Sequence, residues 1–135
     1  MPLQYLLDTN ICIYIAKQRP PKLAERFANL ESGTVAMSLI TFGELRFGAE
    51  KSARRHETMA TLERLTEQIP VLAPGPDVGE TYGLLRATLE KSGTPIGNND
   101  LWIAAHALSL DLTLVSNNLK EFARIPNLKL ENWAE

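Results

Sequence analysis

The sequence predicts an α/β fold, a three-layer α/β/α sandwich with a mainly parallel central sheet. Short apolar runs of strand length alternate with amphipathic segments of helix length along the whole chain. Each apolar run ends in turn-forming residues that lead directly into the next helical segment, which is typical of strands that pair in parallel. The 135 residues suffice for one core. We therefore expect a single domain over residues 1–135.

The first expected strand covers residues 3–7 and breaks into Asp8-Thr9-Asn10. The carboxyl ends of parallel strands are where ligands bind in open α/β sheets, so Asp8 is a candidate for chemistry. Asp is also a favoured N-cap residue, and Asp8 precedes an expected helix at 11–16. Both interpretations of Asp8 are open at this point.

The remaining elements follow from periodicity and from Gly and Pro. Further strands are expected at 34–40, 69–72, 112–115 and 128–130, and further helices at 22–30, 41–49, about 56–68, 77–91, 101–110 and 119–122. The loop 94–97 brings Asn98-Asn99-Asp100 to the front of one helix, and Ser116-Asn117-Asn118 ends the strand at 112–115.

Composition excludes several classes of protein. Hydrophobic residues make up 44% and charged residues 22% of the chain, which excludes wholesale disorder. The net charge of −2 argues against binding nucleic acid by bulk charge alone. One cysteine, Cys12, permits no disulfide within the chain and no thiolate metal cluster. With no secretory signal and no apolar run of membrane-spanning length, we expect a cytoplasmic protein without a membrane partner.

Polar residues gather at one expected edge of the sheet. Asp8 and Ser116-Asn117-Asn118 follow two strands, Glu44 lies in the helix after another, and Asp100 joins them if its helix begins at the same edge. Each has an ordinary structural explanation: a capping box from Thr41 to Glu44, the helix dipole at Asp100, a turn at Asn117-Asn118. Carboxylates gathered together need a cation, and oxygen ligands suit Mg²⁺ or Mn²⁺.

Four segments together resemble the PIN-domain family, and more specifically the VapC toxins of bacterial toxin–antitoxin pairs. They are Leu6-Leu-Asp-Thr-Asn10, Ile40-Thr-Phe-Gly-Glu-Leu45, Pro95-Ile-Gly-Asn-Asn-Asp100 with Ile103-Ala-Ala-His-Ala107, and Leu114-Val-Ser-Asn-Asn118 with Glu121-Phe122. The resemblance implies a Mg²⁺-dependent endoribonuclease that cuts RNA, often tRNA. It further implies silencing by a VapB-like antitoxin, whose tail enters the site, and assembly into a homodimer.

Carried over by motif, the resemblance implies that Asp8 and Asp100 bind the metal and that Glu44 completes an acidic trio. Asn118 stands where many members carry a fourth catalytic acid, and Glu121, one turn further on, is the alternative. A water activated by the metal would attack the phosphodiester in line and leave a 5′-phosphate.

Other residues are candidates for supporting roles. Thr9 and Ser116 are expected either to hold the carboxylates or a phosphate, or to cap helices; Arg46 and Arg86 are candidates for binding RNA or the antitoxin. Further basic candidates are Lys51, Arg54 and Lys91. His106 is six residues after Asp100 and therefore on another helix face, where we expect a core or surface histidine. Cys12 is expected to be buried, and Trp102 to pack in the core or at a subunit contact.

Three rival interpretations remain. A receiver-type signalling domain needs an acceptor Asp at the end of a middle strand, but the second strand here is expected to end in Leu39-Ile40. A haloacid-dehalogenase-like phosphatase needs a second Asp two residues after the first, where this chain has Asn10. A catalytically inactive binding module is consistent with the amide at Asn118.

Overall fold

The structure, a computed structural model, describes residues 2–135 and contains one five-stranded sheet. Its strands are β1 (Tyr5–Leu7), β2 (Val35–Ser38), β3 (Val71–Leu72), β4 (Thr113–Val115) and β5 (Leu130–Glu131). The helices are α1 (Thr9–Lys17), α2 (Pro21–Ala28), α3 (Leu39–Glu50), α4 (Arg55–Gln68), α5 (Pro76–Lys91), α6 (Asn98–Ser109) and α7 (Leu119–Phe122). The expected alternation of strands and helices is therefore confirmed.

All four strand pairings are parallel, in the order β3-β2-β1-β4-β5. Strand β1 lies at the centre, with Tyr5 opposite both Val35 and Thr113. Receiver domains have the order 2-1-3-4-5, so the observed order excludes that alternative.

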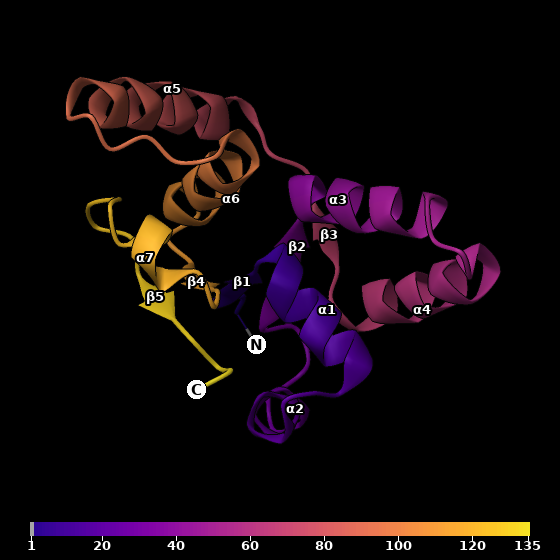
Figure 1. Cartoon of the computed structure of the whole chain (residues 1–135). Helices are drawn as coiled ribbons and strands as arrows, with labels where there is room; N and C mark the ends of the chain where they lie inside the picture. The colour runs from indigo at the N-terminus through magenta and orange to yellow at the C-terminus, as the bar shows by residue number, and fades with distance from the viewer. Residues whose placement is uncertain (1) are drawn as a thin grey trace.

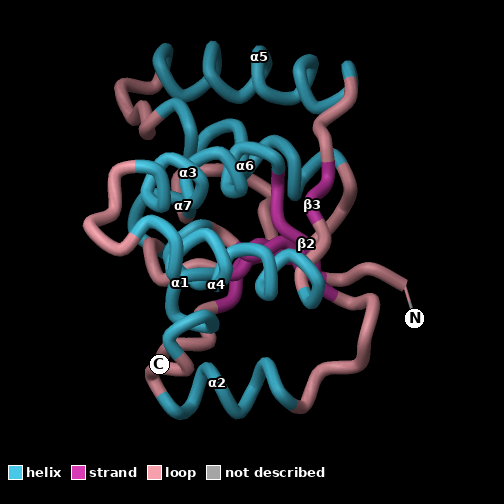
Figure 2. The backbone as a smooth tube through the Cα atoms, turned by 90° about the vertical axis from the view of Figure 1, so that its right-hand side faces the viewer, coloured by secondary structure: helices cyan, strands magenta, loops and turns pink. Residues whose placement is uncertain are grey.

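Successive residues of the central strands bury their side chains in two separate cores. Leu6 and Leu114 belong to a core with apolar residues of α5 and α6, whereas the adjacent Leu7 and Val115 belong to a core with residues of α1, α2 and α4. The sheet is thus covered on both faces, as expected for parallel strands. Figures 1 and 2 show the resulting layers, with α5 and α2 at opposite extremes of the molecule.

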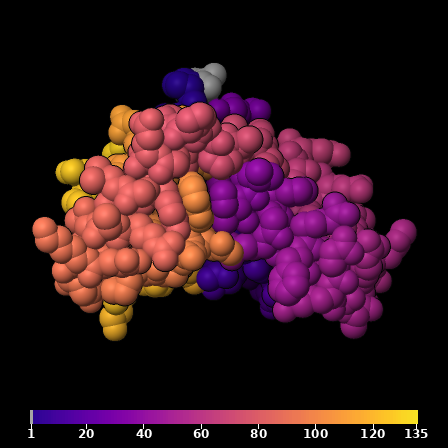
Figure 3. Space-filling model, turned by 90° about the horizontal axis from the view of Figure 1, so that it is seen from above, coloured from indigo at the N-terminus to yellow at the C-terminus, as the bar shows by residue number. Residues whose placement is uncertain are grey.

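Two helical pairs extend from the sheet on different sides. Helices α3 and α4 pack on each other, and so do α5 and α6, as Figure 1 shows. Seen from above, the α5–α6 side and the α3–α4 side bulge apart at the lower edge of the molecule, and indigo N-terminal residues lie in the notch between them (Figure 3).

Two sequence-based expectations near β2 are wrong. Residues Leu39 and Ile40 were expected to end the strand, but they begin α3, because the Ser38 side chain caps this helix by accepting from the Ile40 N–H at 3.2 Å. The expected capping box fails for the same reason: with Ser38 as the N-cap, Glu44 lies beyond the first turn of the helix. The other four strands, β1, β3, β4 and β5, are also shorter than expected.

The expectations for core residues are mostly confirmed. Cys12 is fully buried, and His106 is 1% exposed, with its Nδ1 2.8 Å from the Ser38 Oγ. Trp102 is partly buried and stacks on Tyr82 with ring centroids 3.7 Å apart. No helix in residues 2–135 is long and apolar enough to cross a membrane.

Candidate active site

Asp8 caps a helix and also lies at the edge of the sheet where the sequence predicts chemistry, so the two interpretations of this residue are compatible. It directly follows β1 and caps α1, since its Oδ1 accepts from the Ile11 N–H at 3.0 Å. It is only 5% exposed. Burial raises the pKa of the Asp8 carboxyl, while the Ser116 side chain and the Ile11 N–H stabilise its charged form. A buried carboxylate with fixed orientation therefore lies at the end of the central strand.

Glu44 is held from two sides. The Thr9 hydroxyl of α1 donates to its Oε1 at 2.5 Å, and the Asn99 amide of α6 donates to its Oε2 at 3.3 Å. Thr9 therefore holds a carboxylate, one of the two roles expected for it. The contact from Asn99 was not foreseen, because it depends on how α6 packs beside α3. These bonds place the Glu44 carboxylate between the starts of two other helices.

Asp100 is the third residue of α6, where the helix dipole favours an acid. Within residues 2–135, no side chain or backbone group donates a hydrogen bond to its carboxylate. Burial, followed by the negative charges of Glu121, Asp8 and Glu44, raises its pKa to about 6. The structure thus brings Asp100 into the same electrostatic cluster as the other two predicted acids.

Glu121 is the fourth acid of this cluster. Its Oε1 accepts from the Gly97 N–H at 3.2 Å, and its Oε2 accepts from the Asn118 amide at 2.7 Å. These two bonds lower the pKa of the Glu121 carboxyl. The sequence signal was the spacing, since a residue three positions after Asn118 lies one helical turn on and reaches the same side. Asn118 itself directs its amide at Glu121.

The four carboxylates fit a divalent cation by the chemistry of their oxygen donors. No Lys or Arg in the described part of the chain forms an ion pair with any of them, although the charge of Arg124 acts on Glu121 from further away, so no ion pair offsets their mutual repulsion. Within residues 2–135, no three His, Cys, Asp or Glu side chains stand close enough to enclose a metal ion by themselves. Mg²⁺ commonly uses only one or two carboxylates and completes its coordination with water, which this arrangement permits.

Three of the basic candidates, Arg46, Arg54 and Arg86, lie at the surface and are already paired. Arg46 forms an ion pair with Glu50 at 3.1 Å, and Arg86 pairs with Glu90 at 2.9 Å. Arg86 also donates to the Tyr82 hydroxyl at 2.9 Å. Exposed pairs of this kind contribute little to stability, so they exchange readily for a phosphate partner. Their role in binding stays a prediction.

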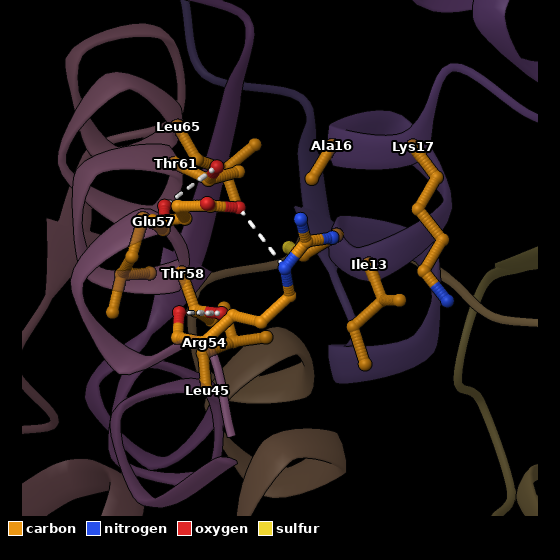
Figure 4. Close-up of a pocket in the computed structure, with 11 residues that line it drawn as sticks. Ile13, Ala16, Lys17, Leu45, Arg54, Glu57, Thr58, Thr61 and Leu65 are labelled. Carbon is orange, nitrogen blue, oxygen red and sulfur yellow. Dashed lines mark hydrogen bonds and ion pairs between the residues drawn. The ribbon is translucent and has the colours of Figure 1, made fainter. Parts of the chain in front are cut away.

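An apolar groove lies between α1 and α4 (Figure 4). It has a volume of about 360 Å³, and Ile13, Leu62 and Leu65 contribute to its apolar lining. Its charged lining residues are Lys17, Arg54 and Glu57, and the last two form an ion pair. Leu45, the neighbour of Glu44 in α3, also lines the groove, so it begins close to the acidic cluster.

Comparison with known proteins gives concordant matches. The model of the PIN domain family matches residues 5–128. The ribonuclease VapC1 of Haemophilus influenzae is 46% identical over 132 residues, which cover 97% of this chain and 98% of that protein. The tRNA(fMet)-specific endonuclease VapC of Salmonella typhimurium is 41% identical over 131 residues, with 97% and 98% covered.

Solved structures agree with these matches. The VapBC-1 structure from nontypeable Haemophilus influenzae contains a chain with a TM-score of 0.90 and 46% identity, and both chains are covered completely. The DNA-bound VapBC structure from Salmonella typhimurium gives a TM-score of 0.91 at 41% identity, over 97% of this chain and 98% of that one.

Proposed function

This chain belongs to the PIN-domain family and, within it, to the VapC ribonucleases, and from this premise we propose that it is a Mg²⁺-dependent endoribonuclease that cleaves tRNA. As the toxin of a toxin–antitoxin pair, it would inhibit translation in the cytoplasm by removing functional tRNA. A relative is named for its action on tRNA(fMet), which makes this tRNA the first substrate to test.

One observation carries the proposal. Four carboxylates, one directly after β1 and one each from α3, α6 and α7, lie near one another at the carboxyl edge of the sheet, and no Lys or Arg in residues 2–135 is ion-paired with them. Without a ligand, a cluster of this kind only destabilises the folded protein, because like charges repel in a partly buried site. A site that binds a divalent cation and a phosphate explains the arrangement.

We assign Asp8 and Asp100 as the residues that hold the metal, with Mn²⁺ as a substitute for Mg²⁺. Asp8 is fixed by its hydrogen bonds, whereas Asp100 has no donor among residues 2–135 and its carboxylate is available to a ligand. When bound, the divalent cation supplies Lewis-acid stabilisation of the charge that develops on the phosphate and activates water for attack.

The other residues act on water and on one another. Glu44, held by Thr9 and Asn99, would orient the attacking water and accept its proton. Glu121 adds the fourth negative charge beside Asp100. Because water rather than the ribose 2′-hydroxyl is the nucleophile, the products carry a 5′-phosphate.

The partner that we propose is a VapB-like antitoxin, since the matching Haemophilus and Salmonella structures are both of VapBC. The groove between α1 and α4 offers an apolar surface for an antitoxin segment, and its charged residues Lys17, Arg54 and Glu57 add polar contacts. A segment that continues beyond Leu45, which lines the groove next to Glu44 in the sequence, would approach the acidic cluster. We also propose that the toxin forms a homodimer.

Cleavage by the antitoxin-free protein tests this function. We expect total tRNA to give discrete fragments with 5′-phosphates in the presence of Mg²⁺ or Mn²⁺ and none in EDTA, while matched single-stranded DNA stays intact. Asp8→Asn and Asp100→Asn should each abolish cleavage and still fold, because Asn keeps the size of the side chain and can cap a helix.

Fragments that persist in both variants would indicate a contaminating nuclease or a wrong assignment of the ligands. A folded protein that cleaves no RNA with either metal would instead support an inactive binding module.

A further inference from the structure

We propose that Asn118 is a positioning residue that acts through Glu121, and that this pair supplies the fourth carboxylate of the site. The inference rests on the metal-dependent function proposed above and goes further by giving the amide at position 118 a specific task. Its starting point is the 2.7 Å hydrogen bond from the Asn118 Nδ2 to the Glu121 Oε2.

The direction of this bond is fixed by chemistry. An ionised carboxylate can only accept hydrogen bonds, so the group that faces it at 2.7 Å must be the NH₂ of the Asn118 amide. A carboxylate at position 118 in the same orientation would instead put two negative charges in contact. With Glu at position 121, an amide at 118 is therefore the favourable partner.

The backbone of Asn118 is itself anchored. Its N–H donates to the Ser116 Oγ at 2.9 Å, and Ser116 is fully buried beside Asp8. The Asn118 side chain makes no capping bond to α7, so its amide is not needed to start that helix. The side chain is free for Glu121 alone.

The far oxygen of Glu121 completes the connection. Its Oε1 accepts from the backbone N–H of Gly97, the residue directly before α6, which carries Asp100. A continuous set of contacts thus runs from Asp8 through Ser116, Asn118 and Glu121 to the start of α6. Removing the Asn118 amide leaves Glu121 with one bond, and its carboxylate can then rotate away from Asp100.

Metal binding measures this effect without any RNA. Titration of the full-length, antitoxin-free protein with Mn²⁺ by calorimetry should show about tenfold weaker binding in Asn118→Ala, the usual size of the effect of removing a residue that supports a metal site without binding the ion. The matched control is Asn117→Ala in the same loop, because Asn117 bonds the Tyr14 hydroxyl and Asn10 but no carboxylate. This control should bind Mn²⁺ like the parent.

The double variant isolates the mechanism. If Asn118 acts through Glu121, then Asn118→Ala should weaken Mn²⁺ binding no further once Glu121→Ala is present. In cleavage assays, Asn118→Ala should lower kcat with little change in KM for tRNA, since the amide positions a carboxylate and does not hold RNA. Thermal melting of every variant verifies that it is folded.

The outcomes separate the two proposals. A parent protein that binds no Mn²⁺ and cleaves no RNA overturns the metal-dependent function and this inference with it. A parent that binds Mn²⁺ together with an Asn118→Ala variant that binds it equally well overturns only the role of Asn118. If Asn118→Ala weakens Mn²⁺ binding as much in the Glu121→Ala background as it does in the parent, the role of Asn118 is also overturned, because Asn118 would then act on the metal site without Glu121.

Discussion

The Asp100 carboxylate should destabilise the metal-free protein at neutral pH, and Asp100→Asn should relieve this cost. The folded state raises the pKa of Asp100 from 3.8 to about 6, through burial and then the charges of Glu121, Asp8 and Glu44. A change of this size corresponds to about 3 kcal/mol in an unscreened site. Two effects reduce the expected gain in the free energy of unfolding of Asp100→Asn to about 1 kcal/mol. Solvent and salt screen the charge at this partly buried position, and the variant loses the favourable interaction of the carboxylate with the dipole of α6.

The pH dependence follows from the sign of the change. Because the folded pKa lies above the unfolded one, the folded protein binds more protons between pH 4 and 6, and its stability rises as pH falls through this window. The advantage of Asp100→Asn should therefore be complete near pH 7 and shrink towards pH 4. Taking the difference between variant and parent cancels the titration of groups that do not interact with Asp100, and leaves that of Asp100 and of its neighbours Glu121, Asp8 and Glu44.

Urea denaturation in EDTA at several pH values measures this difference. Asp111→Asn is the matched control, because Asp111 is 92% exposed at its side chain, forms only an exposed ion pair with Lys129, lies at a positive φ that Asn tolerates and is not among the charges that raise the pKa of Asp100. We expect it to change stability by less than about 0.5 kcal/mol at every pH. An Asp100→Asn variant less stable than the parent at pH 7 would refute the electrostatic reasoning. Excess Mg²⁺ should stabilise the parent and leave the variant unchanged.

Three further predictions concern residues around the site. Thr9→Val removes the hydroxyl that holds Glu44 and should lower kcat for tRNA about tenfold while KM stays unchanged, as steady-state cleavage assays would detect. Ser38→Ala removes the partner of the buried His106 and the cap of α3, and should cost about 2 kcal/mol in urea denaturation. Cys12 is fully buried and burial raises the pKa of its thiol, so thiol reagents should modify it only in denaturant; rapid labelling of the native protein would contradict its burial.

The sheet and the acids at its edge were predictable because they depend on local patterns. Leu6 and Leu7 form an apolar run that must be buried on both faces, and the run stops at Asp8, so the strand, its parallel partners and the position of Asp8 follow together. Asp100 was predictable as the acid in the first turn of an apolar helix. Glu44 was also placed at this edge from the order of the elements, and the resemblance to the family added its role in the acidic trio.

What the sequence did not predict depends on packing between distant elements. Asn99 reaches Glu44 only because α6 lies beside α3, a contact between residues 55 positions apart. The apolar pattern also placed the start of α3 too late. Leu39 and Ile40 continue the apolar run of the strand, whereas the bond from the Ile40 N–H to the Ser38 side chain begins the helix at Leu39. The position of Glu121 against Gly97 likewise depends on the relative placement of α7 and the loop before α6.

A crystal of the antitoxin-free protein grown with Mn²⁺ tests the central claim most directly. Anomalous scattering at the manganese absorption edge locates the ion independently of any activity. Our account predicts a peak coordinated by Asp8 and Asp100, with Glu44 and Glu121 beside it and Asn118 still bonded to Glu121. A fully occupied manganese bound elsewhere, with these carboxylates free of metal, would contradict the account.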